Sequence, residues 1–477
     1  MSGPERSSSR LPPGPRAPRL WQTLQYLARP MPYFEECHRR YGDLFTLRLV
    51  GSGTWVFLAA PDLARALFTA PPGLFETGAM NLSVWGALAG SGTLFTFDDA
   101  RHIERRRLLL PVFHGERLAS YVTAMREVAE SVARSWDPAR PLRIAKAMQE
   151  MTLRTLLRVG FGLGLHASDS SLLRLLSRVA DEVLGSSLLL MPALQLDWGR
   201  LSPWGRMLAL LGELDRELLA EIRRRRATGE RGDDVLSYLL DVRDADERPL
   251  EDRDVRDELM TMLMAGHDTT ETELTWAFSL ILSHPQVLEQ IREEVDRVTG
   301  GAPIERGHLP ELPYLGAVIS ESMRLRPIAP HVAFRRLTRP YAIRGYEIPA
   351  GTIVSNAVHL LHRRADVYAD PLDFRPERFD ASKPDPYAWA PFGGGSRRCI
   401  GMTFALWEMK VILATVLRST DLELVRPRIE RERSGFFVVA RDGLPARVAP
   451  RLGGPGELSS SARPRPASPA EVGVAAG

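Results

Sequence analysis

Residues 392–401 read FGGGSRRCIG and precede an apolar run that begins at Met402 and has the pattern of a helix. Three successive glycines permit tight backbone angles, so this segment can approach a flat ligand closely. Cys399 stands at the start of the helix, where the helix dipole and free N–H groups favour a thiolate, the form of cysteine that binds metals. For an isolated cysteine, however, a structural role beside a glycine-rich turn is the commoner interpretation.

Two other functions of glycine-rich turns do not fit this segment. A phosphate-binding loop is excluded because no Gly-Lys-Ser/Thr follows the glycines. A nucleophile elbow is excluded because Ser396 is followed two positions later by Arg398 instead of glycine. The only other cysteine is Cys37, so a disulfide scaffold and a cysteine-rich zinc or iron–sulfur site are excluded too. We expect Cys37 to be structural.

The segment resembles the haem-binding loop of the cytochrome P450 family, whose spacing is F-x-x-G-x-R-x-C-x-G. Phe392, Gly395, Arg397, Cys399 and Gly401 match that spacing. In this family a cysteine thiolate holds the haem iron. The resemblance implies haem b (iron protoporphyrin IX) with Cys399 as the iron ligand, and Phe392, Gly395 and Arg397 as further cofactor-binding residues.

A second motif lies on a predicted helix upstream of this loop. Glu321 and Arg324 are three positions apart, so their side chains share one helix face and can pair. The tetrapeptide alone would suggest an ordinary surface pair. Its position before the PERF sequence at 376–379 resembles the E-x-x-R helix of the family and its downstream arginine. The resemblance implies a buried triad of Glu321, Arg324 and Arg378.

A third motif lies within Asp254–Ser283, a proline-free run of about 30 residues that would form a helix about 45 Å long. Its centre, Ala265–Thr270, reads AGHDTT, and Gly266 costs a helix about 1 kcal/mol. Residues unfavourable to a helix at its centre suggest a functional site. The oxygen-activating segment of the family has this form, which implies that Asp268 and Thr269 are catalytic and relay protons beside bound O2.

Basic residues supply the remaining candidate cofactor contacts. His102 and Arg106 are four positions apart on a predicted helix and project together. In the family such a pair holds a haem propionate, and Arg335 and Arg397 resemble the other propionate partners. Arginine suits this role because its guanidinium pairs with carboxylates through two hydrogen bonds. The other histidines lack metal-ligand spacing, and we expect packed or solvated side chains at His267, His331, His359 and His362.

Composition limits the class of partner. The chain has 62 basic and 59 acidic side chains, a net charge of +3, and lysine at only three positions. The densest basic run, Arg223–Arg226, is followed at once by acidic residues. Interleaved charges indicate a solvated surface instead of the basic stripe that nucleic-acid binding requires. We therefore expect no nucleic-acid partner.

The chain also lacks a predicted transmembrane segment or secretory signal. Its most apolar stretch, Val183–Leu194, has 12 residues and contains Pro192, well short of the roughly 20 that a bilayer requires. The N-terminal sequence has no apolar core of the kind that signal peptides have. With so few cysteines, these features predict a cytoplasmic protein.

The fold is predicted to be mainly α with a small β part, the cytochrome P450 fold with its long central helix over a buried haem. Length alone suggests about three domains, but no internal linker or repeat is found. We predict a disordered arm at 1–19, a single haem-thiolate monooxygenase domain at 20–452 and a disordered tail at 453–477. Further predicted helices are 33–41, 99–110, 116–135, 142–161, 170–185, 204–227, a helix from Pro285 to Gly300 and 313–326; predicted strands are 44–49 and 55–59, with a meander at 341–355 and a long loop at 75–97.

The resemblance implies a haem-dependent monooxygenase that inserts one atom of O2 into a hydrophobic small molecule. Gly51–Gly53 and Gly162–Gly164 lack the third glycine of a dinucleotide loop, so electrons must come from a separate ferredoxin- or flavodoxin-type donor. We expect this donor to dock near Arg398 and Lys410. A non-catalytic haem protein, and a peroxygenase or isomerase on the same fold, are the alternatives; the intact Asp268–Thr269 pair argues against both.

The substrate pocket is expected to be apolar, and fatty acids, terpenoids and polyketides all remain open as substrates. The segment Leu188–Leu194 is predicted to form part of a mobile lid. The expected lining residues are Met80, Leu82, Val84, Trp85, Leu88, Met262, Ala265, Val332, Phe436 and Phe437.

Overall fold

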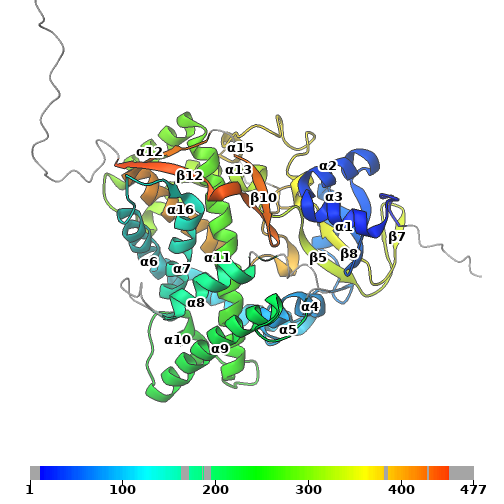
Figure 1. Ribbon diagram of the computed structural model, residues 1–477, viewed down its shortest axis with the longest axis horizontal. Helices are drawn as coiled ribbons and strands as arrows, with labels where there is room; N and C mark the ends of the chain where they lie inside the picture. Colours follow the sequence, from blue (N-terminus) through cyan, green and yellow to red (C-terminus); the bar gives the residue numbers. More distant parts are fainter. Residues whose placement is uncertain are drawn as a thin grey trace, which may run out of the picture.

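The long helix α11 (Asp252–Leu282) runs through the middle of the molecule (Figure 1). The computed structural model describes residues 11–162, 171–184, 186, 195–380, 385–426 and 429–450. With 31 residues, α11 is about 46 Å long, and it packs against α7 (Ile144–Phe161), α13 (Pro313–Leu325) and α16 (Met402–Ser419). Helices therefore surround α11, and its side chains are buried on several sides.

Helix accounts for 58% of the structure and strand for 13%, which confirms the predicted mainly α fold with a small β part. Most helices gather around α11, while α1–α3 lie with the larger sheet on the other side of the molecule (Figure 1). The remaining helices are α1 (Arg19–Ala28), α2 (Pro30–Tyr41), α3 (Pro61–Phe68), α4 (Gly78–Ala89), α5 (Asp99–Leu109), α6 (Gly115–Arg134), α8 (Ser171–Val179), α9 (Pro203–Thr228), α10 (Val235–Asp241), α12 (Pro285–Thr299), α14 (Val358–Leu361) and α15 (Glu377–Asp380). Shorter helical turns are η1 (Leu110–Phe113), η3 (Ala180–Leu184), η6 (Arg306–Glu311), η7 (Gly395–Arg397) and η8 (Arg441–Gly443).

The larger sheet has five strands in the order β1-β2-β8-β5-β3. A glycine turn joins β1 to β2 as predicted, and both Gly51 and Gly53 have positive φ angles there. The strand β2 pairs in parallel with β8, although almost 300 residues separate them in the chain. The strands are β1 (Leu44–Leu49), β2 (Gly53–Leu58), β3 (Phe75–Glu76), β4 (Leu142–Arg143), β5 (Val332–Leu337), β6 (Tyr341–Ile343), β7 (Tyr346–Ile348), β8 (Ile353–Asn356), β9 (Thr420–Leu424), β10 (Arg431–Ser434), β11 (Phe437–Ala440) and β12 (Pro445–Pro450).

Part of the predicted N-terminal arm belongs to the folded body. The amide of Thr46 donates to the carbonyl of Pro13 (2.9 Å), and its hydroxyl donates to the carbonyl of Pro12 (2.7 Å). Gly14 packs so closely that a Cβ there would lie 1.9 Å from the Thr46 carbonyl oxygen. The predicted boundary at residue 20 is therefore too late. Residues 1–10 and the predicted tail at 453–477 lie outside the described residues.

The predicted loop at 75–97 is wrong, because the structure places the 12-residue helix α4 there. Met80 and Leu88 are buried, yet Leu82 is exposed, so apolar residues surround the helix instead of forming one stripe. A helix without an apolar stripe has no 3.6-residue period for sequence analysis to detect. Contacts with α11 supply the packing that the pattern does not indicate.

The predicted triad is confirmed, and its two members on α13 are fully buried, whereas Arg378 on α15 is partly exposed. Arg324 donates to both carboxylate oxygens of Glu321, at 2.6 and 2.8 Å, and both side chains have 0% exposure. Arg378 donates to Glu321 at 3.0 Å. Arg324 also donates to the carbonyls of His362 and Pro371, so the triad ties α13 to a segment about 40 residues downstream.

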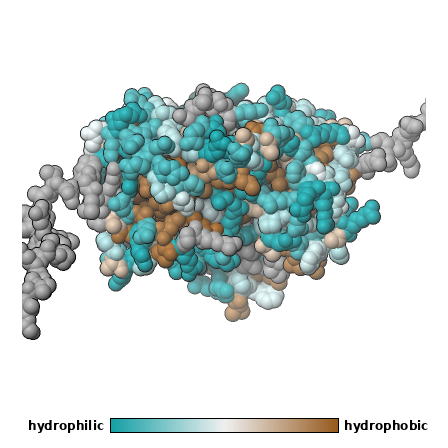
Figure 2. All heavy atoms as spheres, turned by 90° about the horizontal axis from the view of Figure 1, so that it is seen from above, coloured by the Kyte–Doolittle hydropathy of each residue, from teal (hydrophilic) through white to brown (hydrophobic). Residues whose placement is uncertain are grey.

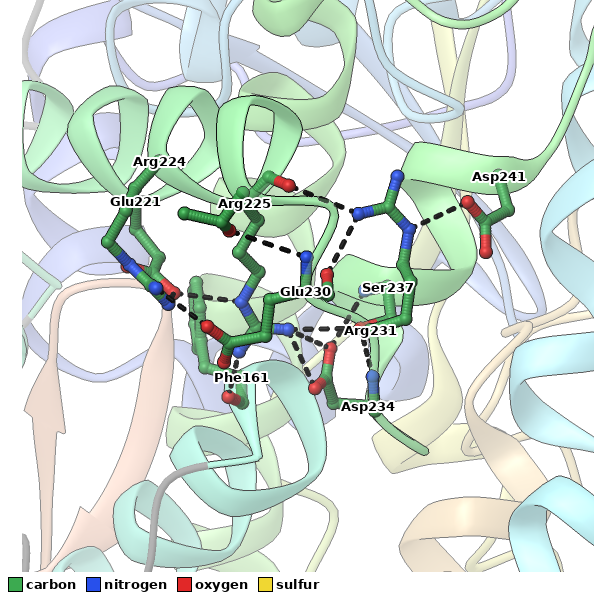
Figure 3. Close-up of polar contacts among 11 residues, drawn as sticks. Phe161, Glu221, Arg224, Arg225, Glu230, Arg231, Asp234, Ser237 and Asp241 are labelled. Atoms are coloured by element: carbon green, nitrogen blue, oxygen red, sulfur yellow. Dashed lines mark hydrogen bonds and ion pairs between the residues drawn. The ribbon is translucent and has the colours of Figure 1, made fainter.

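A second buried charged cluster joins three helices (Figure 3). Arg225 on α9 donates to both oxygens of Asp234, at 2.9 and 2.8 Å, and to the carbonyl of Phe161 at the end of α7. Asp234 in turn caps α10 by accepting from the amide of Ser237 (2.8 Å). The Arg223–Arg226 run was assigned to the solvated surface, which is wrong for Arg225, whose side chain is only 4% exposed.

The face in Figure 2 is mostly hydrophilic, with a hydrophobic area on one side. Many surface arginines have an acidic partner, such as Arg224 with Glu230 (2.7 Å) and Arg344 with Asp62 (2.5 Å). This pairing agrees with the interleaved charges of the sequence. Within the described ranges, every helix is too short or too polar to cross a membrane.

Candidate active site

The glycine-rich loop before α16 packs directly against the end of α3. Gly395 has a φ of +69°, and a Cβ at this position would lie 2.0 Å from the carbonyl oxygen of Phe68. A Cβ at Gly394 would lie 2.3 Å from the Phe68 ring. The amide of Cys399 donates to the carbonyl of Phe392 (3.0 Å), which closes the loop. Glycine is therefore required here both for backbone angle and for space.

Protein atoms surround Cys399, yet the residue is exposed. A side chain in this situation faces a cavity inside the molecule. Burial raises the pKa of the thiol, whereas the amide of Gly401 and the charges of Arg106 and Arg398 act to lower it. A bound cation would complete the stabilisation of the thiolate.

An apolar cavity lies between the middle of α11 and the start of α16. Ala265 is exposed to it although it lies in the middle of the central helix. A Cβ at Gly266 would approach Leu156 on α7 to 3.2 Å, so the helices pack closely beside the cavity. It is lined by Ala265, Gly266, Thr269 and Thr270 from α11, by Ile400, Gly401, Phe404 and Ala405, and by residues of α7 and α10.

Thr269 of the predicted Asp268–Thr269 pair therefore lines the same cavity as Ile400 and Gly401, the two residues that follow Cys399. The Thr269 hydroxyl donates to the carbonyl of Ala265 (2.6 Å). Thr269 lines the cavity, so rotation about its Cα–Cβ bond can turn the hydroxyl towards it. Burial, and secondarily the charge of Asp181, raises the pKa of Asp268 to about 6. A carboxyl with this pKa exchanges protons readily near neutral pH.

Sequence analysis missed two neighbouring acids on α11. Burial, together with the charge of Asp268, raises the pKa of Glu271 to about 8. Burial likewise raises the pKa of Glu273 to about 8. The signal was present in the sequence, because two glutamates stand in an otherwise uncharged stretch of a long helix.

Four basic residues that the sequence analysis selected lie close together. Burial, together with the charges of Arg397 and Arg106, lowers the pKa of His102 to about 4. Burial and Arg397 lower the pKa of Arg335 to about 10. Among the described residues, Arg397 pairs with Asp98 (2.6 Å), whereas Arg106 and Arg335 have no ion pair. The cluster therefore has more positive than negative charge.

Arg335 is held in place by main-chain oxygens. It donates to the carbonyls of Leu67 (2.9 Å) and Gly394 (3.1 Å), and only 6% of the residue is exposed. Burying a guanidinium without an anion is costly, so this position suits an anionic ligand. An apolar cavity, an exposed thiol directly before its lining residues Ile400 and Gly401, and an excess of buried cations together fit haem, which has a flat apolar ring, an iron and two carboxylates.

Lys410 does not lie where the sequence analysis expected it. Its ammonium donates to the carbonyls of Leu309 and Leu312, both at 2.9 Å, and burial lowers its pKa. It is thus used inside the fold, and its expected role in docking is wrong. Arg398, in contrast, is exposed.

The remaining histidines are packed side chains, as expected. Among the described residues, no group of histidine, cysteine or acidic side chains is arranged to hold a metal ion. His267 bonds to Thr152 (2.9 Å) and His331 bonds to Tyr26 (2.8 Å). Burial lowers the pKa of each to about 3, so both are neutral.

Several of the expected pocket residues meet near α4. The ring centroids of Trp85 and Phe436 lie 4.4 Å apart, and Met80 and Leu88, also on α4, are buried. Met262 and Ala265 line the cavity on α11. The predicted lid at Leu188–Leu194 lies outside the described residues, as does the side chain of Val84.

Comparison with known proteins agrees with this arrangement. The family model "Cytochrome P450" matches residues 11–443. The Mycobacterium tuberculosis protein designated cytochrome P450 135B1 is 36% identical over 439 residues, which is 91% of this chain and 89% of the relative. Cytochrome P450 137 of the same organism is 33% identical over 449 residues, 92% of this chain and 91% of the relative.

Solved structures are similar over nearly the whole chain. A cyanobacterial CYP120A1 with bound retinoic acid has a TM-score of 0.82 at 27% identity, covering 93% of this chain and 100% of its own. The haem domain of cytochrome P450DA has the same TM-score and identity and is covered to 98%. Members of this family use haem iron, O2, a redox partner and hydrophobic substrates. The chain therefore belongs to the cytochrome P450 family and is a haem-dependent monooxygenase, an oxidoreductase.

Proposed function

We propose that this enzyme inserts one oxygen atom from O2 into a hydrophobic small molecule, by hydroxylation or epoxidation of a fatty acid, terpenoid or polyketide-like substrate. The observation that supports the proposal is a single apolar cavity. It is lined both by Thr269 of the AGHDTT segment and by Ile400 and Gly401 beside Cys399. An acid–hydroxyl pair opposite a lone thiol is the arrangement that haem-thiolate oxygen chemistry needs.

Haem b is the proposed cofactor, with the Cys399 thiolate as iron ligand. Arg397, Arg106, Arg335 and His102 would bind its carboxylates, since the three arginine charges lie together without sufficient acidic partners and the neutral imidazole of His102 lies beside them. Phe392 and Gly395 would shape the loop around the sulfur. When bound, haem supplies O2 activation and one-electron chemistry, and the protein supplies orientation and electrostatics.

Asp268 and Thr269 are the proposed catalytic residues. With a pKa of about 6, the Asp268 carboxyl is mostly ionised at pH 7 but protonated often enough to deliver protons. The Thr269 hydroxyl now donates to the Ala265 carbonyl, and by rotating it can hydrogen-bond a group in the cavity instead. The pair would thus hold and move protons at the O2 site, while the apolar lining of the cavity would exclude bulk water.

The proposed substrate is elongated and mainly apolar. Trp85 and Phe436 form an aromatic wall, and Met262 and Ala265 add an apolar surface on α11. Retinoic acid, an apolar isoprenoid carboxylate, is bound by the structurally similar CYP120A1, which supports terpenoid-like molecules as first candidates for a binding screen.

A ferredoxin- or flavodoxin-type protein is the proposed electron donor, docking beside the exposed Arg398. Acidic surfaces of such donors would complement this charge. We expect Arg398→Glu to slow electron transfer at low salt, whereas Arg140→Glu, a change at another exposed arginine, should not. Equal rates in both variants would contradict this docking site.

We also propose that the haem domain is a single domain, which starts before residue 20 and extends to residue 452, and that the protein is cytoplasmic. The helix α11 contacts elements from both halves of the chain, which supports a single domain. The two cysteines are free, and Cys399 must stay reduced to bind iron.

The absorption spectrum of the reduced, carbon monoxide-bound protein tests the central proposal. We expect the red-shifted Soret band of a thiolate ligand, lost in Cys399→His but retained in Cys37→Ser. A wild-type band without the red shift would refute Cys399 as the iron ligand.

Thr269→Ala tests the proton-relay role. Product formed per electron consumed should fall, and peroxide release should rise, because protons no longer reach bound O2 in the right place. If the enzyme were a peroxygenase, Thr269→Ala would leave its peroxide-driven turnover unchanged. Unchanged coupling in Thr269→Ala would show that the hydroxyl has no such role.

A further inference from the structure

We propose that Asp98 is a positioning residue that fixes α4 and connects it to Arg397, and thereby sets the affinity for ligands bound above the haem. The inference rests on the proposed function, because it takes the α4 region as part of the ligand pocket and Arg397 as a cofactor contact. Asp98 itself lies outside both the cysteine loop and the AGHDTT segment.

The first observation is that Asp98 caps α4 from a distance of 20 residues in the chain. Its Oδ1 accepts from the amides of Thr77 and Gly78, both at 2.9 Å, and its Oδ2 accepts from Gly78 (2.9 Å) and Ala79 (3.3 Å). Thr77, at the N-cap position, makes no side-chain cap of its own. Free amides at a helix N-terminus need an acceptor, and a carboxylate also complements the helix dipole.

Close packing brings these amides within reach of the carboxylate. A Cβ at Gly78 would lie 2.3 Å from the carbonyl oxygen of Thr96, so α4 begins directly against the backbone that precedes Asp98. Asn81, one turn later, donates to the carbonyl of Phe95 (2.9 Å). The N-terminal turn of α4 therefore has little freedom as long as Asp98 stays in place.

The second observation is the link to the cysteine loop. Arg397 donates to Asp98 Oδ1 at 2.6 Å and to the carbonyl of Phe97. The main-chain carbonyl of Asp98 accepts from the amide of His102 (3.2 Å), which starts α5. One residue thus joins α4, α5 and the loop that carries Cys399.

The other end of the α4 segment is fixed independently. The amide of Gly92 donates to Asp257 and that of Leu94 donates to Glu258, both at 2.9 Å, and both acids lie on α11. Of the two anchors, only Asp98 is bonded to a proposed cofactor contact. Arg397, which donates to Asp98, is also the residue that would hold a haem carboxylate, so one guanidinium would serve both groups. The N-terminus of α4, and with it the Trp85–Phe436 wall, is then positioned by the same charge that holds the cofactor.

Asp98→Asn tests the proposal in the haem-loaded full-length protein, with Asp99→Asn as the matched control. Asp99 is the adjacent acid, and its side chain accepts only from the amide of Gly73 (3.2 Å) among the described contacts. Amide hydrogen exchange reads the cap directly. We expect exchange in residues 77–90 to be faster in Asp98→Asn, by at most the roughly 30-fold that complete loss of a helix cap gives, because the side-chain nitrogen of Asn cannot accept from Gly78 and Ala79; exchange should be unchanged in Asp99→Asn.

Ligand affinity is measured with 4-phenylimidazole, an apolar probe that binds haem iron and is detected by the Soret shift. Its dissociation constant should rise by a similar factor in Asp98→Asn, with the wavelength of the carbon monoxide band unchanged. Asp98→Glu, which keeps the charge, should restore part of both effects and replaces Asp98→Asn if that variant does not fold.

Unchanged exchange in residues 77–90, or equal effects of the Asp98 and Asp99 variants, would overturn the proposal. If Asp98 had only a general structural role, Asp98→Asn would speed exchange throughout the molecule instead of only in the α4 segment. That result would also overturn the proposal. Failure of the proposed function is distinguished by the wild-type carbon monoxide band, because exchange of α4 amides does not depend on which ligand holds the iron.

Discussion

Buried carboxyl groups are concentrated in the middle of α11, where a helix interior would normally be apolar. Burial raises the pKa values of Asp268, Glu271 and Glu273 to about 6, 8 and 8. Only Asp268 has a proposed role in the reaction. Glu273 is 7% exposed, and among the described residues its Oε2 has no hydrogen-bond partner. Such a group destabilises the folded state whenever it is ionised.

We predict that Glu273→Gln makes the protein less sensitive to alkaline pH. A carboxyl with a pKa of about 8 when folded and 4.5 when unfolded favours folding when protonated. Its contribution is complete below pH 4.5 and is lost as the pH rises through 8. At pH 7, about 2.5 units above the pKa of the unfolded state, the lost stability is up to about 3 kcal/mol, because each pKa unit corresponds to about 1.36 kcal/mol.

The measurement is the free energy of unfolding in urea between pH 5 and pH 8. The slope of this free energy against pH should decrease in Glu273→Gln by the contribution of about one bound proton. It should stay unchanged in Glu289→Gln, a change at an exposed acid on α12. An identical slope in wild type and Glu273→Gln would show that Glu273 is not the titrating group.

At the scale of elements, charged side chains join helices that are far apart in the chain. Arg225 is the clearest example, because one guanidinium binds the end of α7, the start of α10 and its own helix α9 (Figure 3). Its neighbour Arg224 is half-exposed and pairs with Glu221 and Glu230 on the surface. The two arginines are adjacent in sequence but have different environments.

We predict that Arg225→Met destabilises the protein by about 3–5 kcal/mol, the usual effect of removing one partner from a buried ion pair. Asp234 would be left buried without its partner, and the Phe161 carbonyl would lose its donor. Arg224→Met is the control and should change stability little, because surface pairs contribute little. Urea unfolding measures both variants, and similar losses in the two would contradict the distinction.

At the scale of the whole molecule, one hydrophobic cluster extends from Leu88 to Ala446. Two smaller clusters surround the five-stranded sheet. The buried triad of Glu321, Arg324 and Arg378 connects α13 with the segment that leads to the cysteine loop. Its loss should therefore affect more than one element.

We predict that Glu321→Gln lowers both overall stability and haem retention. The variant leaves Arg324 buried without a countercharge, which costs about 3–5 kcal/mol. Thermal unfolding and the haem content after gel filtration measure the effect. Glu311→Gln, at an exposed acid just before α13, should behave like wild type, and a Glu321→Gln variant with normal haem content would contradict the prediction.

Features that depend on short spacings along the chain could be predicted from the residues alone. The E-x-x-R triad, the proline-free helix α11 and the glycine turn between β1 and β2 were all predicted, and the structure contains them. The spacing of the cysteine loop also led to the correct family. Such features are readable because backbone conformation and i,i+3 or i,i+4 contacts follow from neighbouring residues.

The burial of individual side chains and their long-range contacts, in contrast, could not be predicted and follow from how the elements pack. Helix α4 was missed because its stability comes from α11 and from Asp98, which caps it from outside. Arg225 and Lys410 were assigned to the surface because their carbonyl and carboxylate partners lie elsewhere in the chain. Burial and long-range hydrogen bonds depend on which segments meet in space, and no local pattern of residues specifies that meeting.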